Sequence, residues 1–251
     1  MRRRRGDHRD EGSPAGEYLP GSLAAKFASS YGWPLSTNNI MVEGELDVQY
    51  FELANALYMN KHSKTLLDKS LSLFAVGRRE QGGTHNFRGK FELLREILRI
   101  DPEDKYGNSF RVVCLLDNDY AGKRLCYELK DAGFVLNKDV FLLHRQMPRS
   151  TRDPAQFGKY IREQNSEWSE LDCEIEDLLT RELLELFIDE YPNSLQSEPH
   201  ISGSAHHYDL TTDGKSKLIR FVREYASLRD VQGLVEILQT IRYLLKLDLE
   251  A

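Results

Sequence analysis

Two groups of acidic residues in this chain have the types and spacing of a metal site. The first, Glu-Gly-x-x-Asp, holds Glu43 and Asp47, and the second, Asp-x-Asp, holds Asp117 and Asp119. Carboxylates that converge on one point repel one another strongly unless a cation lies between them. Oxygen ligands without Cys or His partners favour Mg²⁺ or Mn²⁺ over zinc. The two groups therefore predict a site for Mg²⁺ or Mn²⁺ that acts on the phosphates of nucleic acid.

These acids can meet only if the segments before them lie side by side. Each group directly follows a short apolar run, IMV at 40–42 and VVCLL at 112–116, as expected of buried strands in a parallel sheet. Ligands of such sheets bind outside the carboxyl ends of the strands. Apolar runs alternate with segments of helical periodicity, which predicts an α/β fold: a four-stranded, mainly parallel sheet with helices on both faces. We expect strands at 39–42, 71–76, 111–116 and 140–143, and helices at 22–31, 48–57, 87–100 and 121–132.

Glycines beside both acidic groups fit the same prediction. Gly44 would allow a sharp turn after Glu43, and Gly122 would let a helix begin close to a metal or a phosphate. Gly133 fits the C-terminal end of that helix. The alternative interpretation is that the acids are helix N-caps and solvated turn residues, since an Asp before a helix is a common cap. The occurrence of both patterns, each after an apolar run, favours the metal site.

The second half of the chain is more polar and predicts fewer regular elements. Residues 192–214 are rich in Ser, Pro, Gly and His, which indicates a linker or a mobile loop. His206 and His207 lie in this stretch and are expected on the surface. The segments around it have helical periodicity. We expect helices near 155–164 and at 172–191, 215–228 and 231–247.

The patterns divide the chain into three regions. Residues 1–20 hold a basic run, Arg2 to Arg5, followed by polar residues, and are expected to be a disordered tail. Residues 21–191 form the predicted catalytic domain. Residues 192–251 are expected to be the linker and a helical C-terminal extension.

The composition is that of an ordinary globular protein and sets limits on function. The chain has 251 residues, 40% of them hydrophobic and 29% charged, so a core can form. It has no apolar run long enough for a membrane span, no secretory signal, and three cysteines without a CxxC pair. We expect a cytoplasmic protein without a membrane partner. A net charge of −6 argues against binding nucleic acid by charge alone, although formal charge leaves bound metal ions out.

The two acidic groups resemble the TOPRIM domain, in which one hydrophobic strand ends in Glu-Gly and a later one in Asp-x-Asp. The matching segments are IMVEGELD at 40–47 and VVCLLDNDYAG at 112–122, and the resemblance covers about residues 39–190. The family includes topoisomerases, bacterial primases, recombination proteins, RNA-maturation nucleases and OLD (overcoming lysogenization defect) nucleases. The resemblance implies a general base or metal ligand at Glu43, metal ligands at Asp117 and Asp119, and a residue that holds a ligand or a metal-bound water at Asp47.

A third acidic segment narrows the resemblance to the OLD nucleases. DCEIEDLLTRELLELF at 172–187 is similar to their late acidic segment, which implies that Glu174 and Glu176 bind a second metal. The alternative is that acids in a first helical turn stabilise the helix dipole. These nucleases also carry a basic residue at the head of a later helix, for which Lys215 is the best match and Lys217 the next. A lysine there would neutralise charge on the scissile phosphate.

The function implied by the resemblance is hydrolysis of DNA phosphodiester bonds with two Mg²⁺ or Mn²⁺ ions. OLD proteins usually carry an ATPase domain, but GxxxxGK[ST] is absent here. Either this chain acts alone, or an ATPase is a separate subunit, as in a two-component anti-phage defence system. Two alternatives stay open. One is primase-like nucleotidyl transfer, although no N-terminal cysteine zinc module is present. The other is a non-catalytic module that binds nucleic acid or a partner. The sequence also leaves open RNA as the substrate and the oligomeric state.

Basic residues near the expected carboxyl edge of the sheet would guide the backbone of the nucleic acid. They are Arg78, Arg79, Arg88, Lys90, Lys123 and Arg124. The loop Gly82-Gly83-x-His85 either admits a phosphate or is a flexible connection. Aromatic residues are not interleaved with the basic ones, so the sequence indicates no stacking platform for bases.

Overall fold

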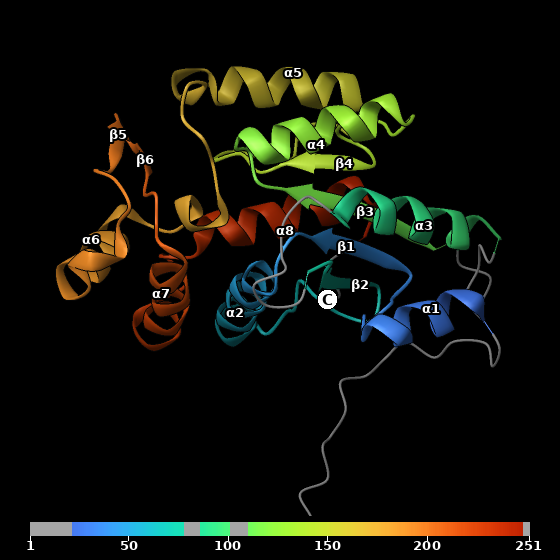
Figure 1. Ribbon diagram of the computed structural model, residues 1–251, viewed down its shortest axis with the longest axis horizontal. Coiled ribbons are helices and arrows are strands. Elements are labelled where there is room, and N and C mark those ends of the chain that lie inside the picture. Colours follow the sequence, from blue (N-terminus) through green and yellow to red (C-terminus); the bar gives the residue numbers. More distant parts are fainter. Residues whose placement is uncertain (1–21, 78–85, 101–109, 248–251) are drawn as a thin grey trace, which may run out of the picture.

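The chain folds around a four-stranded parallel sheet, which confirms the predicted fold class. The computed structural model describes residues 22–77, 86–100 and 110–247. The expected tail, Arg78, Arg79 and the loop from Gly82 to His85 lie outside these residues. The strands are β1 (Asn38–Val42), β2 (Leu71–Ala75), β3 (Arg111–Leu116) and β4 (Val140–Leu142), in the order β2-β1-β3-β4 (Figure 1).

β1 and β3 lie side by side, as the convergence of the two acidic groups requires. Met41 of β1 lies opposite Phe74 of β2 on one side and Cys114 of β3 on the other, and both pairings are parallel. The same parallel pairing continues from β3 to β4. Glu43 and Asp117 directly follow β1 and β3, and they therefore emerge at the same edge of the sheet.

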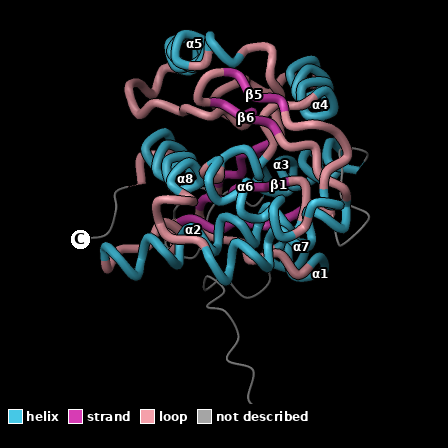
Figure 2. The backbone as a smooth tube through the Cα atoms, turned by 90° about the vertical axis from the view of Figure 1, so that its left-hand side faces the viewer, coloured by secondary structure: helices cyan, strands magenta, loops and turns pink. Residues whose placement is uncertain are grey.

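Both faces of the sheet are buried, because successive side chains of a strand point to opposite sides. In β1, Ile40 and Val42 belong to one hydrophobic core and Met41 to the other. The core of Met41 is covered by α1 (Leu23–Tyr31), α3 (Phe87–Ile100) and α4 (Tyr120–Asp131). The opposite core is covered by α2 (Glu45–His62), α5 (Pro154–Gln164) and α8 (Gln232–Leu244). Figure 2 shows α2 and α8 on one side of the sheet and α1, α3 and α4 on the other.

Local signals in the sequence explain where several helices begin and end. Ser22 caps α1, because its side chain accepts a hydrogen bond from the backbone of Ala25 at 3.2 Å. Buried residues of α3 recur every three to four positions, as a helix that buries one face requires. Gly133, just after α4, has a φ of 92°, which favours glycine. Among the helices of the described residues, none combines the length and the apolar character that crossing a membrane needs.

The helices after residue 192 share a core with the sheet. α7 (Thr212–Tyr225) contacts α2, and α8 contacts α2 as well. Leu218 of α7 and Leu238 of α8 belong to the same cluster of buried side chains as Ile40 of β1. The expected domain boundary near residue 191 therefore falls within one continuous core. Figure 1 places α6 (Arg181–Glu190) and α7 beyond the carboxyl ends of the strands.

The prediction of one helix at 172–191 is wrong. The segment holds a 3₁₀ helix, η4 (Ile175–Leu178), and then α6, and Leu179 and Thr180 between them have extended backbones. A tertiary contact explains the break. The backbone N–H of Thr180 donates to the carbonyl of Asp230 at 3.0 Å, and its hydroxyl donates to the Asp230 carboxylate at 2.7 Å.

The prediction of a linker at 192–214 is also wrong. The segment forms a 3₁₀ helix, η5 (Pro192–Ser194), and an antiparallel hairpin of β5 (His200–Ser202) and β6 (Ala205–His207). β5 is exposed throughout, whereas Ala205 and His206 of β6 are buried. Polar composition does not indicate this hairpin, because some of its polar groups bond within the protein. The carbonyl of His206 accepts from Arg145, and the ring of His207 bonds to Asp177.

Candidate functional site

The first acidic group lies where β1 turns into α2. Glu43 directly follows β1, and the backbone of Asp117 holds its carboxylate by a hydrogen bond. Asp47 lies in the first turn of α2, where its Oδ2 accepts the backbone N–H of Gly44 at 2.8 Å. The cap interpretation is thus correct for one oxygen of Asp47. Gly44 itself has an extended backbone, and an added Cβ would make only ordinary contacts, so the expected need for glycine there is wrong.

The second acidic group is locked to the start of α4. Asp119 is the N-cap of this helix, and its Oδ1 accepts the backbone N–H of Gly122 at 2.6 Å. A Cβ on Gly122 would lie 1.9 Å from the backbone oxygen of Asp117. Only glycine allows this approach, so α4 begins in contact with the backbone of Asp117. The expected closeness to a metal or a phosphate stays a prediction. The first turn of α4 therefore fixes the backbone of Asp117.

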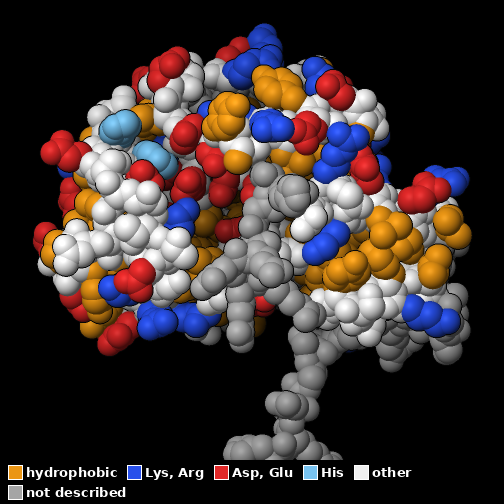
Figure 3. All heavy atoms as spheres, in the orientation of Figure 1, with side chains coloured by type: hydrophobic (Ala, Val, Ile, Leu, Met, Phe, Trp, Pro, Cys, Tyr) orange, Lys and Arg blue, Asp and Glu red, His pale blue; other side chains and the backbone are white. Residues whose placement is uncertain are grey.

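The third acidic segment is tied to the end of β3 by backbone hydrogen bonds. The N–H of Asn118 donates to the carbonyl of Cys173 at 2.9 Å, and the N–H of Cys173 donates back at 3.3 Å. This short bridge brings Glu174 and Glu176, on either side of the start of η4, to the edge that carries Asp117. In Figure 3, Asp and Glu side chains gather beyond the strand ends of Figure 1, on the side of the β5–β6 hairpin.

One lysine reaches these acids from α7. Nζ of Lys215 lies 2.5 Å from Oε2 of Glu174 and 3.7 Å from Oε1 of Glu176. Burial lowers the pKa of Lys215, but the charges of Glu176 and Glu174 outweigh this effect and raise the pKa above its usual value. Lys217 instead pairs with Asp213 of its own helix at 2.6 Å. Of the two candidate lysines, Lys215 is the one at the acidic cluster.

The carboxylates at this edge raise one another's pKa because they are buried together. Burial raises the pKa of Glu43 from 4.5 to about 7, and the charges of Asp47 and Asp119 add to the effect. Burial also raises the pKa of Glu176 to about 7, and it raises the pKa of Asp117 well above the usual value. A site in which ionised carboxylates are so unfavourable gains stability when a cation binds.

Several polar atoms of the site are buried without a partner. Among the described residues, these include Oε1 of Glu43, Oε2 of Glu176 and the hydroxyl of Tyr50. Such atoms are rare in native proteins, and carboxylate oxygens are the ligands that Mg²⁺ prefers. The donor set therefore fits Mg²⁺ or Mn²⁺. Within the part of the chain that the structure describes, however, no three His, Cys, Asp or Glu side chains could hold one ion as they stand. The carboxylates would have to move towards a bound ion.

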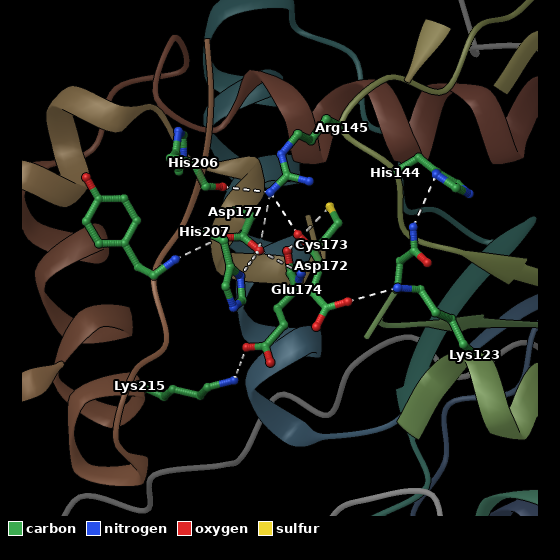
Figure 4. A network of polar contacts seen from close by, with 12 residues as sticks. Lys123, His144, Arg145, Asp172, Cys173, Glu174, Asp177, His206, His207 and Lys215 are labelled. Atoms are coloured by element: carbon green, nitrogen blue, oxygen red, sulfur yellow. Dashed lines mark hydrogen bonds and ion pairs between the residues drawn. The ribbon is translucent and has the colours of Figure 1, made fainter. Parts of the chain in front are cut away.

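A buried polar network beside the acidic cluster holds η4 in place (Figure 4). Oδ2 of Asp177 accepts the backbone N–H of Glu174 at 2.9 Å and lies 2.8 Å from Nδ1 of His207. A guanidinium nitrogen of Arg145 donates to the carbonyls of Asp172 and His206, at 2.8 and 2.7 Å. The network joins the β5–β6 hairpin to the segment that carries Glu174. The roles of Asp177 and Arg145 in it do not follow from any pattern in the sequence.

The prediction that both histidines lie on the surface is wrong. His206 is buried, and in the described residues neither nitrogen of its ring has a hydrogen-bond partner. His207 is only 17% exposed, and its hydrogen bond with Asp177 raises its pKa. His206 is buried and His207 is half-buried, and β6 contacts η4.

The basic residues proposed for nucleic acid differ in their surroundings. Lys123 pairs with Asp172 at 2.8 Å, which links α4 to the third acidic segment. Lys90 donates to the carbonyl of Val76 at 2.9 Å, beyond the end of β2. Arg88 and Arg124 are exposed, and each pairs with a glutamate of its own helix.

The fold and the site define the chain as an α/β protein with a cluster of carboxylates and one lysine at the carboxyl edge of its sheet. No protein-family model, curated protein or solved structure matches the chain. The chemistry of the site therefore has to indicate the function.

The raised pKa values predict how stability depends on pH and metal. The pKa of Glu43 and Glu176 rises from 4.5 to about 7 on folding, so the stability that these groups contribute is present at low pH and is lost as pH rises through about 7. The melting temperature of the metal-free protein should fall between about pH 5 and pH 8. Mg²⁺ or Mn²⁺ should raise it more at the higher pH, because ionised carboxylates bind the ion.

The control is the double variant Glu43→Gln/Glu176→Gln, in which both the fall and the response to metal should be reduced. Thermal melts of both proteins at two pH values, with and without the ion, give the melting temperature under all four conditions. Equal melting temperatures at both pH values, with no response to metal, would contradict this account of the cluster.

The contact between His207 and Asp177 predicts different effects for two isosteric changes. The amide nitrogen of an asparagine occupies the place of Nδ1, whereas that of a glutamine occupies the place of Nε2. His207→Asn should keep the hydrogen bond to Asp177 and unfold in urea like the wild type. His207→Gln should lose about 1–3 kcal/mol, because it leaves a buried carboxylate short of a partner, and it should bind Mn²⁺ more weakly. If Asn and Gln behave alike, Nδ1 does not have this role.

Proposed function

We propose that this chain hydrolyses phosphodiester bonds of DNA with Mg²⁺ or Mn²⁺, as a TOPRIM nuclease of the OLD type. The observation that supports this most is the meeting of three acidic segments and one lysine at a single edge of the sheet. Glu43 follows β1, Asp117 follows β3, and Glu174 and Glu176 flank the start of η4 beside Lys215. Their order along the chain and their place at strand ends agree with the resemblance in the sequence.

The carboxylates divide by position into two sets. Asp117 and Asp119 would hold a first ion at the ends of β1 and β3, with Glu43 either as a further ligand of that ion or as the general base. Glu174 and Glu176 would hold a second ion. Bound there, Mg²⁺ or Mn²⁺ would lower the pKa of a water molecule and offset the charge of the phosphate. One carboxylate oxygen of Asp47 accepts the hydrogen bond that caps α2, which leaves the other oxygen for a ligand or a water.

Two side chains have the environment for steps that the protein itself performs. The carboxylate of Glu43 would accept the proton of the attacking water, a role that suits a base whose pKa is near neutrality. The ammonium of Lys215 stays charged, since Glu174 and Glu176 raise its pKa. Once a cation takes over those carboxylates, Lys215 would be released to pair with the scissile phosphate.

Cleavage of supercoiled plasmid with Mg²⁺ or Mn²⁺ tests the proposal. Glu43→Gln should lower kcat by about 10²–10⁴, the contribution that a positioned general base makes, and Asp117→Asn/Asp119→Asn should also be inactive. Glu182→Gln is a matched control, because Glu182 is an exposed acid on α6. Cleavage by Glu43→Gln at the wild-type rate would refute the central role of this residue. Incorporation of labelled nucleotides into a primer, without cleavage, would indicate primase-like transfer instead.

The two lysines of α7 provide a second test. Lys215→Met should lower kcat by about 10²–10³, as the loss of one group that stabilises transition-state charge does. Lys217→Met should cut like the wild type, because Lys217 pairs with the exposed Asp213. Circular dichroism checks that both variants fold. A loss of cleavage in Lys217→Met alone would show that the wrong lysine has been assigned.

A further inference from the structure

The outer face of α4 carries two exposed tyrosines. Tyr120 is 79% exposed and Tyr127 is 68% exposed. Tyr120 and Tyr127 are seven positions apart, so they lie on the same side of the helix. Arg124 lies between them on that side. Aromatic residues that are not interleaved with basic ones predict no stacking platform, but on α4 Arg124 lies between Tyr120 and Tyr127 on one face.

This face begins at the acidic cluster. Tyr120 directly follows Asp119, the N-cap of α4. Among the large hydrophobic side chains of the described residues, Tyr120 is the most exposed. It does not contribute to the core, although α4 buries Leu125, Cys126 and Leu129 on its other side. An aromatic ring in solvent next to a site for phosphate chemistry is placed to contact the substrate.

A shallow groove of about 460 Å³ separates this face from α3. Arg88 of α3 and Arg124 of α4 line the groove together with Tyr120. Arg88 pairs with Glu92 at 2.7 Å and Arg124 with Glu128 at 3.0 Å. These pairs join neighbouring turns on exposed helix surfaces and contribute little to stability. Either arginine can therefore leave its glutamate for a phosphate.

We propose that an unpaired nucleic-acid strand leaves the acidic cluster along this face of α4, with one base stacked on Tyr120 and a later one on Tyr127. Arg124 contacts the phosphate between them. The proposal rests on the nuclease function above and names its substrate class: nucleic acid that is single-stranded, or locally unpaired, on one side of the cleaved bond.

Two arguments favour an unpaired strand over a duplex. A base can stack on a tyrosine only if one of its faces is free, and in a duplex both faces are covered by neighbouring bases. The groove also holds as many carboxylates as arginines, and the chain carries a net charge of −6. Charge alone therefore does not hold a duplex here, whereas stacking does not depend on net charge. Tyr120 and Tyr127 lie about 10 Å apart along the helix axis, a distance that a few nucleotides span.

Binding of fluorescent oligonucleotides to the full chain tests this path. The measurement uses Glu43→Gln protein with Mg²⁺, so that the DNA stays intact, and compares a single-stranded thymidine oligomer with a blunt hairpin duplex. Adding Tyr120→Ala should weaken single-strand binding about 5- to 100-fold, the range for loss of one stacked base. Tyr120→Trp should keep it, and the affinity for the duplex should not change. Tyr225→Ala removes an exposed tyrosine of α7 and is the matched control.

The outcomes separate this proposal from the nuclease function. Equal losses for single strand and duplex in Tyr120→Ala, or no loss at all, would overturn the stacking path. If wild-type protein still cuts plasmid in that case, the nuclease function stands without it. If the wild type neither cuts nor binds DNA, both ideas fail. A 2-aminopurine base in the oligomer reports stacking directly. Its fluorescence should change on binding to protein that keeps Tyr120 and should not change on binding to the Tyr120→Ala variant.

Discussion

Several carboxylates are buried together at one edge of the sheet, where their charged forms are unfavourable. Burial is the main cause of the raised pKa of Glu43, Asp117 and Glu176, because it removes the solvent that would stabilise their charges. The charges of Glu43 and Glu176 raise the pKa of Asp117 further. Such a cluster persists only if its backbone is held firmly. The protein does this with a glycine that lets α4 touch Asp117 and with a two-way backbone bridge between Asn118 and Cys173.

The scaffold around the cluster follows from the same constraint. Two of the acidic segments begin a helix with a carboxylate that caps its first turn, at Asp47 and Asp119. The third uses Asp177 in the same way, and His207 and Arg145 keep that buried carboxylate paired. Asp47 and Asp119 each use one carboxylate oxygen for the cap, so the other oxygen is available for a ligand. The β5–β6 hairpin contributes to the site because its His207 bonds to Asp177.

The sequence predicts the parts of this structure that depend on local patterns. The strand at 111–116 and the helix at 87–100 match the structure at both ends, because buried strands and one-sided helices have strong periodic signals. The placement of Glu43 and Asp117 at one edge also follows, since strands that run in parallel end together.

The parts that the sequence does not predict depend on contacts between distant residues. Asp177 and His207 are 30 positions apart, and neither has a neighbour that marks it as a partner. The break between η4 and α6 is caused by Asp230, which lies beyond α7. Helical periodicity runs through residues 172–191 without showing that break. Polar composition likewise cannot distinguish a solvated loop from a hairpin in which the carbonyl of His206 and the ring of His207 bond to buried partners.

The position of Lys215 late in the chain has a consequence for synthesis. All six carboxylates of the cluster precede residue 177, whereas the lysine that pairs with two of them, and the hairpin that braces η4, come after residue 199. A chain still on the ribosome therefore exposes the acids before it has their counter-charge or their brace. If the proposed function is correct, the growing chain lacks the charge that Lys215 would supply, and the site is completed only when α7 packs against α2.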